Sequence, residues 1–159
     1  MTTGDVRADA DVDLVLDFLN TLNVESGTDL LDDPAGRHAW LAARGLSDDD
    51  SPGPVRAALR AAVGDPAPGP AMASAPVTVS LDAAGPRLVA DEVSGAVLAA
   101  ACRLAVLGDW DRIKICPADD CRWAFFDRSR NHSRTWCSMR ACGNREKARA
   151  WRERARAGN

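Results

Sequence analysis

The 159-residue chain lacks an apolar run long enough to cross a bilayer, and it lacks a recognisable signal peptide. Its first twenty residues instead carry five aspartates, at Asp5, Asp9, Asp11, Asp13 and Asp17. Both absences predict a cytoplasmic protein that does not contact a membrane. In such a reducing compartment, closely spaced cysteines indicate metal binding rather than disulfide bonds.

Histidine is scarce, and lysine is missing from the first 110 residues, where all seven basic residues are arginine. Neither His38 nor His132 belongs to a recognisable pattern of nucleophile and base, so the sequence predicts no enzymatic activity. Because arginine replaces lysine along this whole stretch, the choice of arginine elsewhere carries little functional information.

The net charge of -3 conceals two oppositely charged parts. Residues 111–159 hold 13 Lys+Arg and 6 Asp+Glu, whereas residues 1–110 hold 7 and 17. The basic part is expected to attract polyanions. The acidic part repels them, and it is expected to sense a signal or to contact a partner protein.

Four of the five cysteines form two matching CxxxxC pairs, Cys116 with Cys121 and Cys137 with Cys142, separated by fifteen residues. Two short loops with two thiols each can surround one tetrahedral ion, which predicts one structural Zn²⁺. Four thiolates leave no open position for water or substrate. His132 is the alternative fourth ligand. The fifth cysteine, Cys102, lies in an apolar run and is expected to be buried.

Hydrophobic periodicity predicts an α+β fold for residues 1–110. Residues 12–22 fit a helix better than the alternating strand that they also resemble. Further helices are expected from Asp33-Pro34 to Gly45, over 54–63, and over 93–107 with Gly108 as the stop. Residues 64–76 form a connector, and residues 77–90 a β-hairpin.

Residues 111–159 are expected to form a zinc finger. A strand at 122–127, a turn at 129–132, a return strand at 133–136 and a helix at 144–157 are predicted around the two cysteine loops. The order of knuckle, hairpin, knuckle and helix is typical of a treble-clef finger. A module of this size has little core, so the metal should supply much of its folding free energy.

Four short stretches resemble two known families. Trp136–Met139, Cys142–Lys147 and the upstream Phe126–Asn131 are similar to the CGNR zinc finger, and Leu16–Thr21 resembles the start of the ABATE domain that usually precedes this finger in bacterial proteins. The resemblance implies a stress-related transcription regulator with DNA or RNA as its partner.

Arginine is concentrated on the last predicted helix. Arg145, Arg149, Arg152 and Arg156 fall within about 60° of one another and span about 16 Å, which suits a row of phosphates. The neighbouring stripe of Ala148, Trp151 and Ala155 is expected to pack on the finger. Further basic candidates in the finger are Arg128, Arg130, Arg134 and Arg140. The sequence favours duplex DNA over RNA.

Two other interpretations of the finger remain open. The helix is merely solvated if Glu146 and Glu153 pair with the arginines three residues further on. Alternatively, the finger binds an acidic protein surface without touching nucleic acid. Asn144 either caps the helix or contacts a base edge. The sequence is compatible with a homodimer, but no residue indicates one.

The polar and aromatic candidates each have a structural alternative. Trp136 and Phe126 are expected in the core of the finger, and Phe125 is the better candidate for an exposed face that stacks on bases. Asn20 and Thr21 either line a small-ligand pocket or satisfy backbone groups at the end of a helix, and the second interpretation is preferred.

Overall fold

The computed structural model describes residues 3–48, 52–67, 69 and 72–157, with residues 3–7 and 157 described by their backbone alone. In chain order its helices and strands are α1 (Thr3–Leu19), β1 (Leu22–Asn23), β2 (Thr28–Asp29), α2 (Pro34–Ala42), α3 (Pro52–Ala62), β3 (Thr78–Asp82), β4 (Gly85–Val89), α4 (Val93–Leu107), β5 (Ile113–Ile115), β6 (Ala124–Phe126) and α5 (Asn144–Ala157). The described strands form three separate antiparallel pairs. The predicted α+β fold is confirmed.

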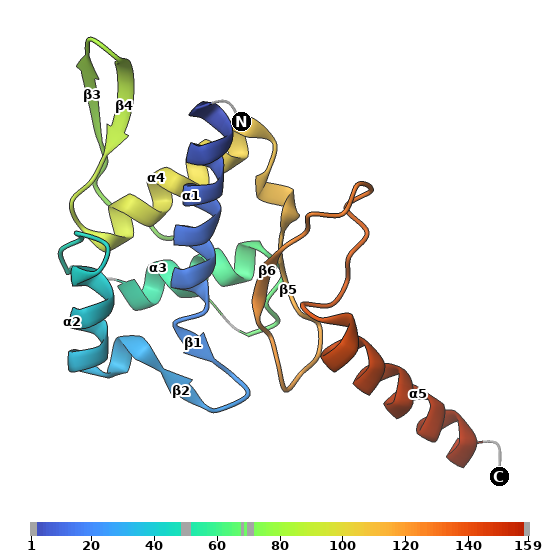
Figure 1. The fold of residues 1–159 in the computed structure, drawn as a ribbon. Coiled ribbons are helices and arrows are strands. Elements are labelled where there is room, and N and C mark those ends of the chain that lie inside the picture. The colour runs from blue at the N-terminus through green and yellow to red at the C-terminus, as the bar shows by residue number, and fades with distance from the viewer. Residues whose placement is uncertain (1–2, 49–51, 68, 70–71, 158–159) are drawn as a thin grey trace.

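Helices α1 and α4 form the centre of the molecule and lie against each other (Figure 1). Val15 and Phe18 of α1 and Val97 and Leu104 of α4 are completely buried. The helical interpretation of residues 12–22 is therefore confirmed as far as Leu19, where α1 ends. None of the described helices combines the length and the apolar character needed to cross a bilayer.

The predicted start of α2 is confirmed in detail. The Asp33 side chain accepts a hydrogen bond from the backbone N–H of Ala35 at 3.2 Å, and Pro34 occupies the first helical position. Beyond α3, the described residues of the predicted 64–76 connector contain no helix or strand, and residues 68, 70 and 71 lie outside the described part. The predicted hairpin is confirmed as β3 and β4.

Helix α4 has the predicted bounds and ends at Gly108, whose φ of 79° is the left-handed value that favours glycine at this position. The expectation that Cys102 is buried is wrong, because this side chain is exposed. One side of α4 packs on α1 and α3, and the other faces solvent. Cys102 and, one turn on, Val106 lie on the solvent side.

The finger differs from its prediction in strand pairing. Strand β6 pairs with β5, which precedes the first cysteine loop, and the predicted return strand at 133–136 is absent from these described residues. Ile113, Ile115 and Ala124 of this sheet are buried in the same core as α1 and α4. The β5–β6 face that packs on α1 therefore fixes the finger to the rest of the molecule.

One glycine on α4 tests how closely the 64–76 connector packs. A Cβ on Gly95 would lie 2.4 Å from the Pro76 carbonyl oxygen, whereas a Cβ on Gly53 of α3 meets nothing within 4 Å. Gly95→Ala should therefore destabilise the fold by about 1–3 kcal/mol through overpacking. Gly53→Ala should be neutral or stabilising by up to about 1 kcal/mol. Thermal unfolding of both variants measures the difference, and equal melting temperatures would contradict the close approach.

Candidate zinc centre and basic arm

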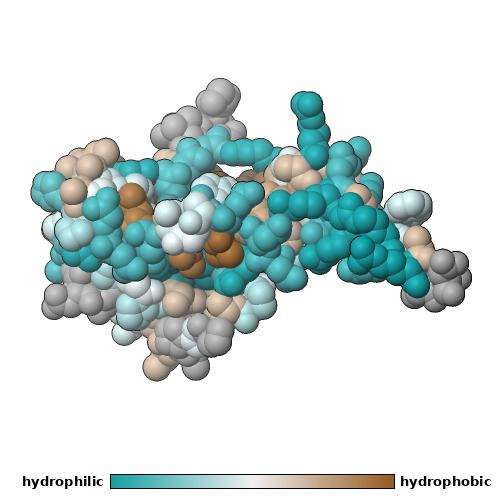
Figure 2. Space-filling model, turned by 90° about the horizontal axis from the view of Figure 1, so that it is seen from below, coloured by the Kyte–Doolittle hydropathy of each residue, from teal (hydrophilic) through white to brown (hydrophobic). Residues whose placement is uncertain are grey.

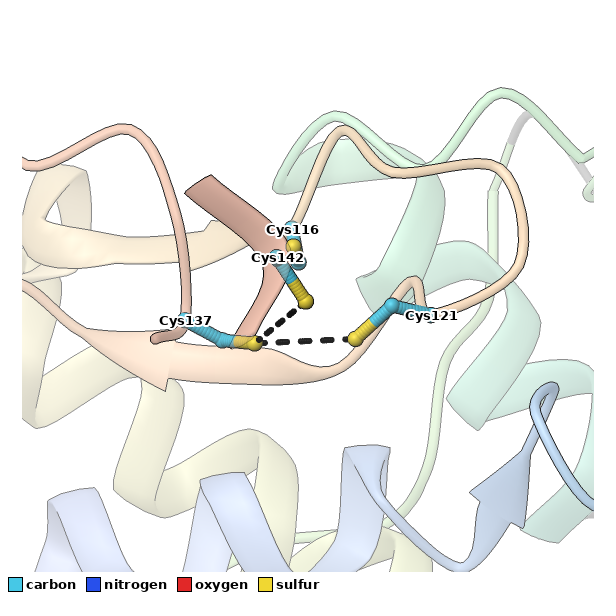
Figure 3. Close-up of side chains that lie close together, drawn as sticks. All are labelled: Cys116, Cys121, Cys137 and Cys142. Carbon is cyan, nitrogen blue, oxygen red and sulfur yellow. Dashed lines mark hydrogen bonds between the residues drawn. The ribbon is translucent and has the colours of Figure 1, made fainter. Parts of the chain in front are cut away.

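The four predicted ligands come together at the base of α5. Cys116 directly follows β5, Cys121 lies in the loop before β6, and Cys137 and Cys142 flank the start of a one-turn π-helix over Met139–Gly143 that continues into α5. Figure 3 shows the four side chains pointing toward a common centre. The fold thus brings the two CxxxxC loops together, as the sequence predicts.

The sulfur positions fit one tetrahedral ion. The Sγ atom of Cys137 lies 3.5 Å from that of Cys121 and 3.6 Å from that of Cys142, and all four sulfur atoms lie within 4.8 Å of one another. A tetrahedron with Zn–S bonds of about 2.3 Å has S–S edges of about 3.8 Å. A disulfide would need about 2.05 Å. The cluster is therefore consistent with one structural zinc ion, held by four thiolates.

The thiols cannot all ionise without a cation among them. Burial raises the pKa of the Cys142 thiol to about 11, and burial likewise raises the pKa of Cys137. Burial also opposes ionisation of Cys116, but hydrogen bonds from the backbone of Cys137 and Ala118 outweigh it and hold the Cys116 pKa below its ordinary value. Zn²⁺ would remove the conflict, because its charge deprotonates coordinating thiols outright.

Local hydrogen bonds shape both cysteine loops. In the first loop, Cys116 N–H donates to the Trp123 carbonyl at 2.9 Å. In the second, the Ser138 hydroxyl accepts from the Ala141 N–H at 3.2 Å and so caps the helical segment that leads into α5. Asn144 lies beyond this cap, on an exposed helical position, and therefore does not act as the cap.

The aromatic residues of the finger are distributed differently from their prediction. Phe125 is buried beside the cysteines, so the expectation that it is the exposed stacking residue is wrong. Trp136 packs against the same cluster, as predicted, whereas Phe126 is half-buried at the edge of the main core. Trp123 is the exposed aromatic side chain of the first loop.

A buried ion pair orders the chain between the two cysteine loops. The fully buried Asp127 carboxylate accepts from Lys114 Nζ at 2.6 Å and from the Ser129 and Arg134 N–H groups, both at 2.9 Å. Burial opposes ionisation, but these bonds outweigh it and hold the pKa of Asp127 well below its ordinary value. Lys114 also donates to the His132 carbonyl, so His132 contributes its backbone here and not a metal ligand.

The end of α1 is bonded directly to the finger. The Asn20 amide donates to the Ala124 carbonyl at 3.0 Å and accepts from the Ala124 N–H at 2.8 Å. Thr21 accepts from Arg56, which also holds Asp29. Asn20 and Thr21 thus satisfy other polar groups, as the preferred interpretation has it.

Asn20 and Thr21 also lie at a cavity, as the alternative interpretation of a ligand pocket expects. Both residues line an open cavity of about 620 Å³ between residues 1–110 and the finger, with Trp40 and Trp123 on its walls. Asn20, which bonds the finger, is half-buried, whereas Thr21 is buried and bonds Arg56. A ligand in this cavity would contact both parts of the chain.

A second connection, centred on the buried Arg60, uses charges that periodicity did not reveal. Arg60 is 3 % exposed; it donates to Asp65 at 2.6 Å, to the Leu19 carbonyl at 2.9 Å and to the Arg122 carbonyl at 2.8 Å. Asp65 also accepts from the Arg122 side chain. No sequence motif marks these residues; the only signal is an arginine on the apolar face of a predicted helix.

Helix α5 projects from the body as an arm (Figure 1). Residues 147–156 are all exposed, and Trp151 is 66 % exposed, so the expectation that Ala148, Trp151 and Ala155 pack on the finger is wrong. The finger's small core is filled by Phe125, Trp136 and the cysteines and leaves no site for this stripe. Viewed from below, the arm forms a hydrophilic surface at one end of the molecule (Figure 2).

The predicted basic residues fall into two groups. In the first group, another group of the protein already binds the guanidinium. Three of these arginines form ion pairs: Arg145 with Asp120 at 2.7 Å, Arg149 with Glu146 at 2.8 Å, and Arg128 with Asp9 at 3.2 Å. The fourth, Arg134, donates a hydrogen bond to the Trp136 carbonyl at 2.9 Å. The second group is exposed and has no ion pair with any described residue: Arg130, Arg140, Arg152 and Arg156. Two of these four, Arg152 and Arg156, lie on the outer half of the arm.

Together, the closed four-thiolate centre and the shared helical core define a zinc-finger protein in which the metal is structural. Residues 112–155 match the model of the CGNR zinc finger. Residues 12–109, well over half of the chain, match the model of a family described as "Putative stress-induced transcription regulator", and the chain belongs to this family. Both expected resemblances are confirmed, in the expected order. No curated protein matched the chain.

Loss of one thiolate should remove the metal and unfold the second loop. Cys142→Ser is expected to lower zinc affinity more than about 100-fold and to reduce helical content, because α5 begins directly after this loop. The matched control is Cys102→Ser, which changes the exposed cysteine. Metal analysis and circular dichroism measure both effects. Full zinc content in Cys142→Ser would refute the ligand assignment.

The chain over 128–134 should depend on the Asp127 carboxylate. Because the folded-state pKa of Asp127 lies below its ordinary value, the contribution of this charge is complete at pH 7 and is lost as the pH falls through the ordinary value toward the folded one. Asp127→Asn should therefore accelerate amide hydrogen exchange over 128–134 at pH 7 by about tenfold or more. The control, Asp119→Asn, changes an exposed carboxylate, and equal exchange in both variants would contradict the role of Asp127.

Proposed function

We propose that the protein is a non-enzymatic, cytoplasmic transcription regulator whose α5 arm binds nucleic acid, with residues 1–110 as its regulatory part and residues 111–159 as its binding part. Membership of the regulator family supports the regulatory role. The observation that carries the binding role is the arm itself, since residues 147–156 are exposed on every side and Arg152 and Arg156 pair with no described acidic group.

Duplex DNA is the favoured polymer because of the shape of the arm. A helix of about 10–12 Å diameter fits the major groove of B-DNA, which is about 12 Å wide. The major groove of A-form RNA is too narrow for such a helix. A helix packed along the body could not enter a groove, whereas the ion pairs that join α5 to other described elements involve only Arg145 and Arg149, in its first two turns.

The inner half of the arginine row serves a different purpose in this proposal. Arg145 pairs with Asp120 of the first cysteine loop, and Arg149 lies 3.9 Å from Asp119. These pairs hold α5 at a set angle to the metal centre. Phosphates would then contact the outer residues Arg152 and Arg156, with Arg140 beside the helix start and Asn144 close enough to the groove to contact a base edge.

Salt dependence tests the proposal. Zinc-loaded protein should bind random duplex DNA with a log–log salt slope of about −0.9 per phosphate contact. Arg152→Ala should weaken binding to all sequences and make the slope shallower by about one contact, and adding Arg156→Ala should do so again. Arg37→Ala, which removes an arginine from α2, is the control. Fluorescence anisotropy measures the slopes, and an unchanged slope in the double variant would overturn the binding role.

One observation favours a second candidate, an acidic protein partner. Trp151 is 66 % exposed among free arginines, and an exposed tryptophan beside arginine is typical of protein-binding hot spots. Trp151→Ala separates the two candidates. Unchanged salt-dependent binding to DNA in this variant supports the phosphate role, whereas an absence of DNA binding in the wild-type protein supports the acidic partner.

A further inference from the structure

The β3–β4 hairpin projects from the molecule at the side away from α5 (Figure 1). It is a sheet of only two strands, and the outer edge of neither strand pairs with another strand of the described chain. Isolated two-stranded sheets are marginally stable in water, and proteins usually protect open strand edges with charge, proline or a cover. The open strand edges of the hairpin are therefore expected to be protected by their own side chains or covered by a partner.

One face of the hairpin is apolar and exposed. Val79 and Leu81 point to the same face and are 71 % and 78 % exposed. Their cross-strand neighbours are Leu88 and Pro86, so all four side chains on this face are apolar. The segment that leads into it, residues 66–81, contains no charged residue. Asp82, the last residue of β3, is thus the only charge on this strand, and Thr78–Leu81 have no charge-based protection.

Proline identifies which edge is open. Pro86 has no N–H, so its pair with Leu81 must be a non-hydrogen-bonded one. The two kinds of pair alternate, and the Val79–Leu88 pair is then also non-hydrogen-bonded. The N–H and C=O groups of Val79 and Leu81 consequently point away from β4. On the opposite edge, Pro86 interrupts the row of donors, which protects β4 but not β3.

We propose that β3 pairs with β3 of a second copy of this chain, antiparallel and with the two-fold axis at Ser80. This register places Val79 opposite Leu81 of the second copy, and both have outward backbone groups, as a hydrogen-bonded pair requires. Ser80 of one copy lies opposite Ser80 of the other copy in a non-hydrogen-bonded pair. The two hairpins then form one four-stranded sheet with a continuous apolar face.

Self-complementarity is the reason for choosing a second copy as the occupant. About Ser80 the pattern Thr-Val-Ser-Leu-Asp pairs apolar with apolar residues, and Asp82 meets Thr78, not another charge. The hairpin's own charges, Asp82 and Arg87, bind each other within one copy. Such a two-fold contact closes on itself and does not propagate. Because only five residues of each strand pair, the contact is smaller than a standard interface, and a concentration-dependent dimer is expected.

Sedimentation equilibrium of the zinc-loaded chain tests the dimer and does not depend on nucleic-acid binding. The wild type should pass from monomer to dimer between roughly 1 μM and 500 μM. Val79→Pro removes an outward donor on β3 and should raise the dissociation constant at least tenfold. Leu88→Pro removes the matching donor on β4 and should leave the constant unchanged. A wild type that stays monomeric overturns the proposal and leaves a strand of another protein as the occupant.

A crosslink tests the register without relying on a folding-sensitive variant. In a Cys102→Ser background, Ser80→Cys places two thiols across the axis at a separation that a disulfide can span. Thr78→Cys is the control on the same strand, because the two copies of this residue would lie about 13 Å apart along the strands. Under mild oxidation with zinc bound, the Ser80→Cys chain should dimerise covalently at least ten times faster. Equal rates would overturn the register.

Discussion

The position of the zinc finger depends on the pairing between the end of α1 and the backbone of β6. Asn20 forms both a donor and an acceptor bond with Ala124, and the adjacent Leu19 carbonyl accepts from the buried Arg60. Arg60 reaches the Arg122 carbonyl in the first cysteine loop. The Arg60–Leu19 bond is buried, so breaking it would leave a buried polar group unpaired, at a cost of about 1–3 kcal/mol, while the other three bonds are partly buried. The finger therefore cannot rotate freely against the helical part.

A fixed finger gives the α5 arm a fixed direction. The metal joins the two cysteine loops, the second loop continues into α5, and Asp120 holds Arg145 on the first turn. Each of these connections is a short-range contact. Together they fix the direction of α5 relative to the α1–α4 core, although α5 itself has almost no contact with that core. An arm of this kind is preorganised, which lowers the entropic cost of placing it in a groove.

The local elements could be predicted from the sequence, and the long-range contacts could not. Periodicity and caps located α4 to the residue, because Gly108 and the run of apolar residues are local signals. The pairing of β6 with β5 was missed because residues 113–115, before the first cysteine loop, were not predicted as a strand; Ile113 and Ile115 are buried in the same core as α1. Burial of Phe125 follows from that same choice.

The candidate site shows the same division. Cysteine spacing predicted all four ligands, since a tetrahedral ion needs two pairs of closely spaced thiols and this pattern is visible in the sequence. Arginine spacing predicted a common helix face, but it could not reveal that Asp119 and Asp120 lie within reach of Arg145 and Arg149, because the first cysteine loop is about 25 residues away along the chain. The assumption that a stripe with a tryptophan must be covered also failed, because the finger core is already filled.

The distribution of charge relates the first cysteine loop, the α5 arm and the β3–β4 hairpin to one another. Acidic groups of the first cysteine loop occupy the inner arginines, and the exposed outer arginines are the ones farthest from the acidic first part. A polyanion approaching the molecule would be attracted by the basic residues 111–159 and repelled by the acidic residues 1–110, and this asymmetry would orient it toward the arm before contact. The open β3 edge lies on the side away from the arm (Figure 1). Association there would leave α5 accessible, so each copy could present its arm independently.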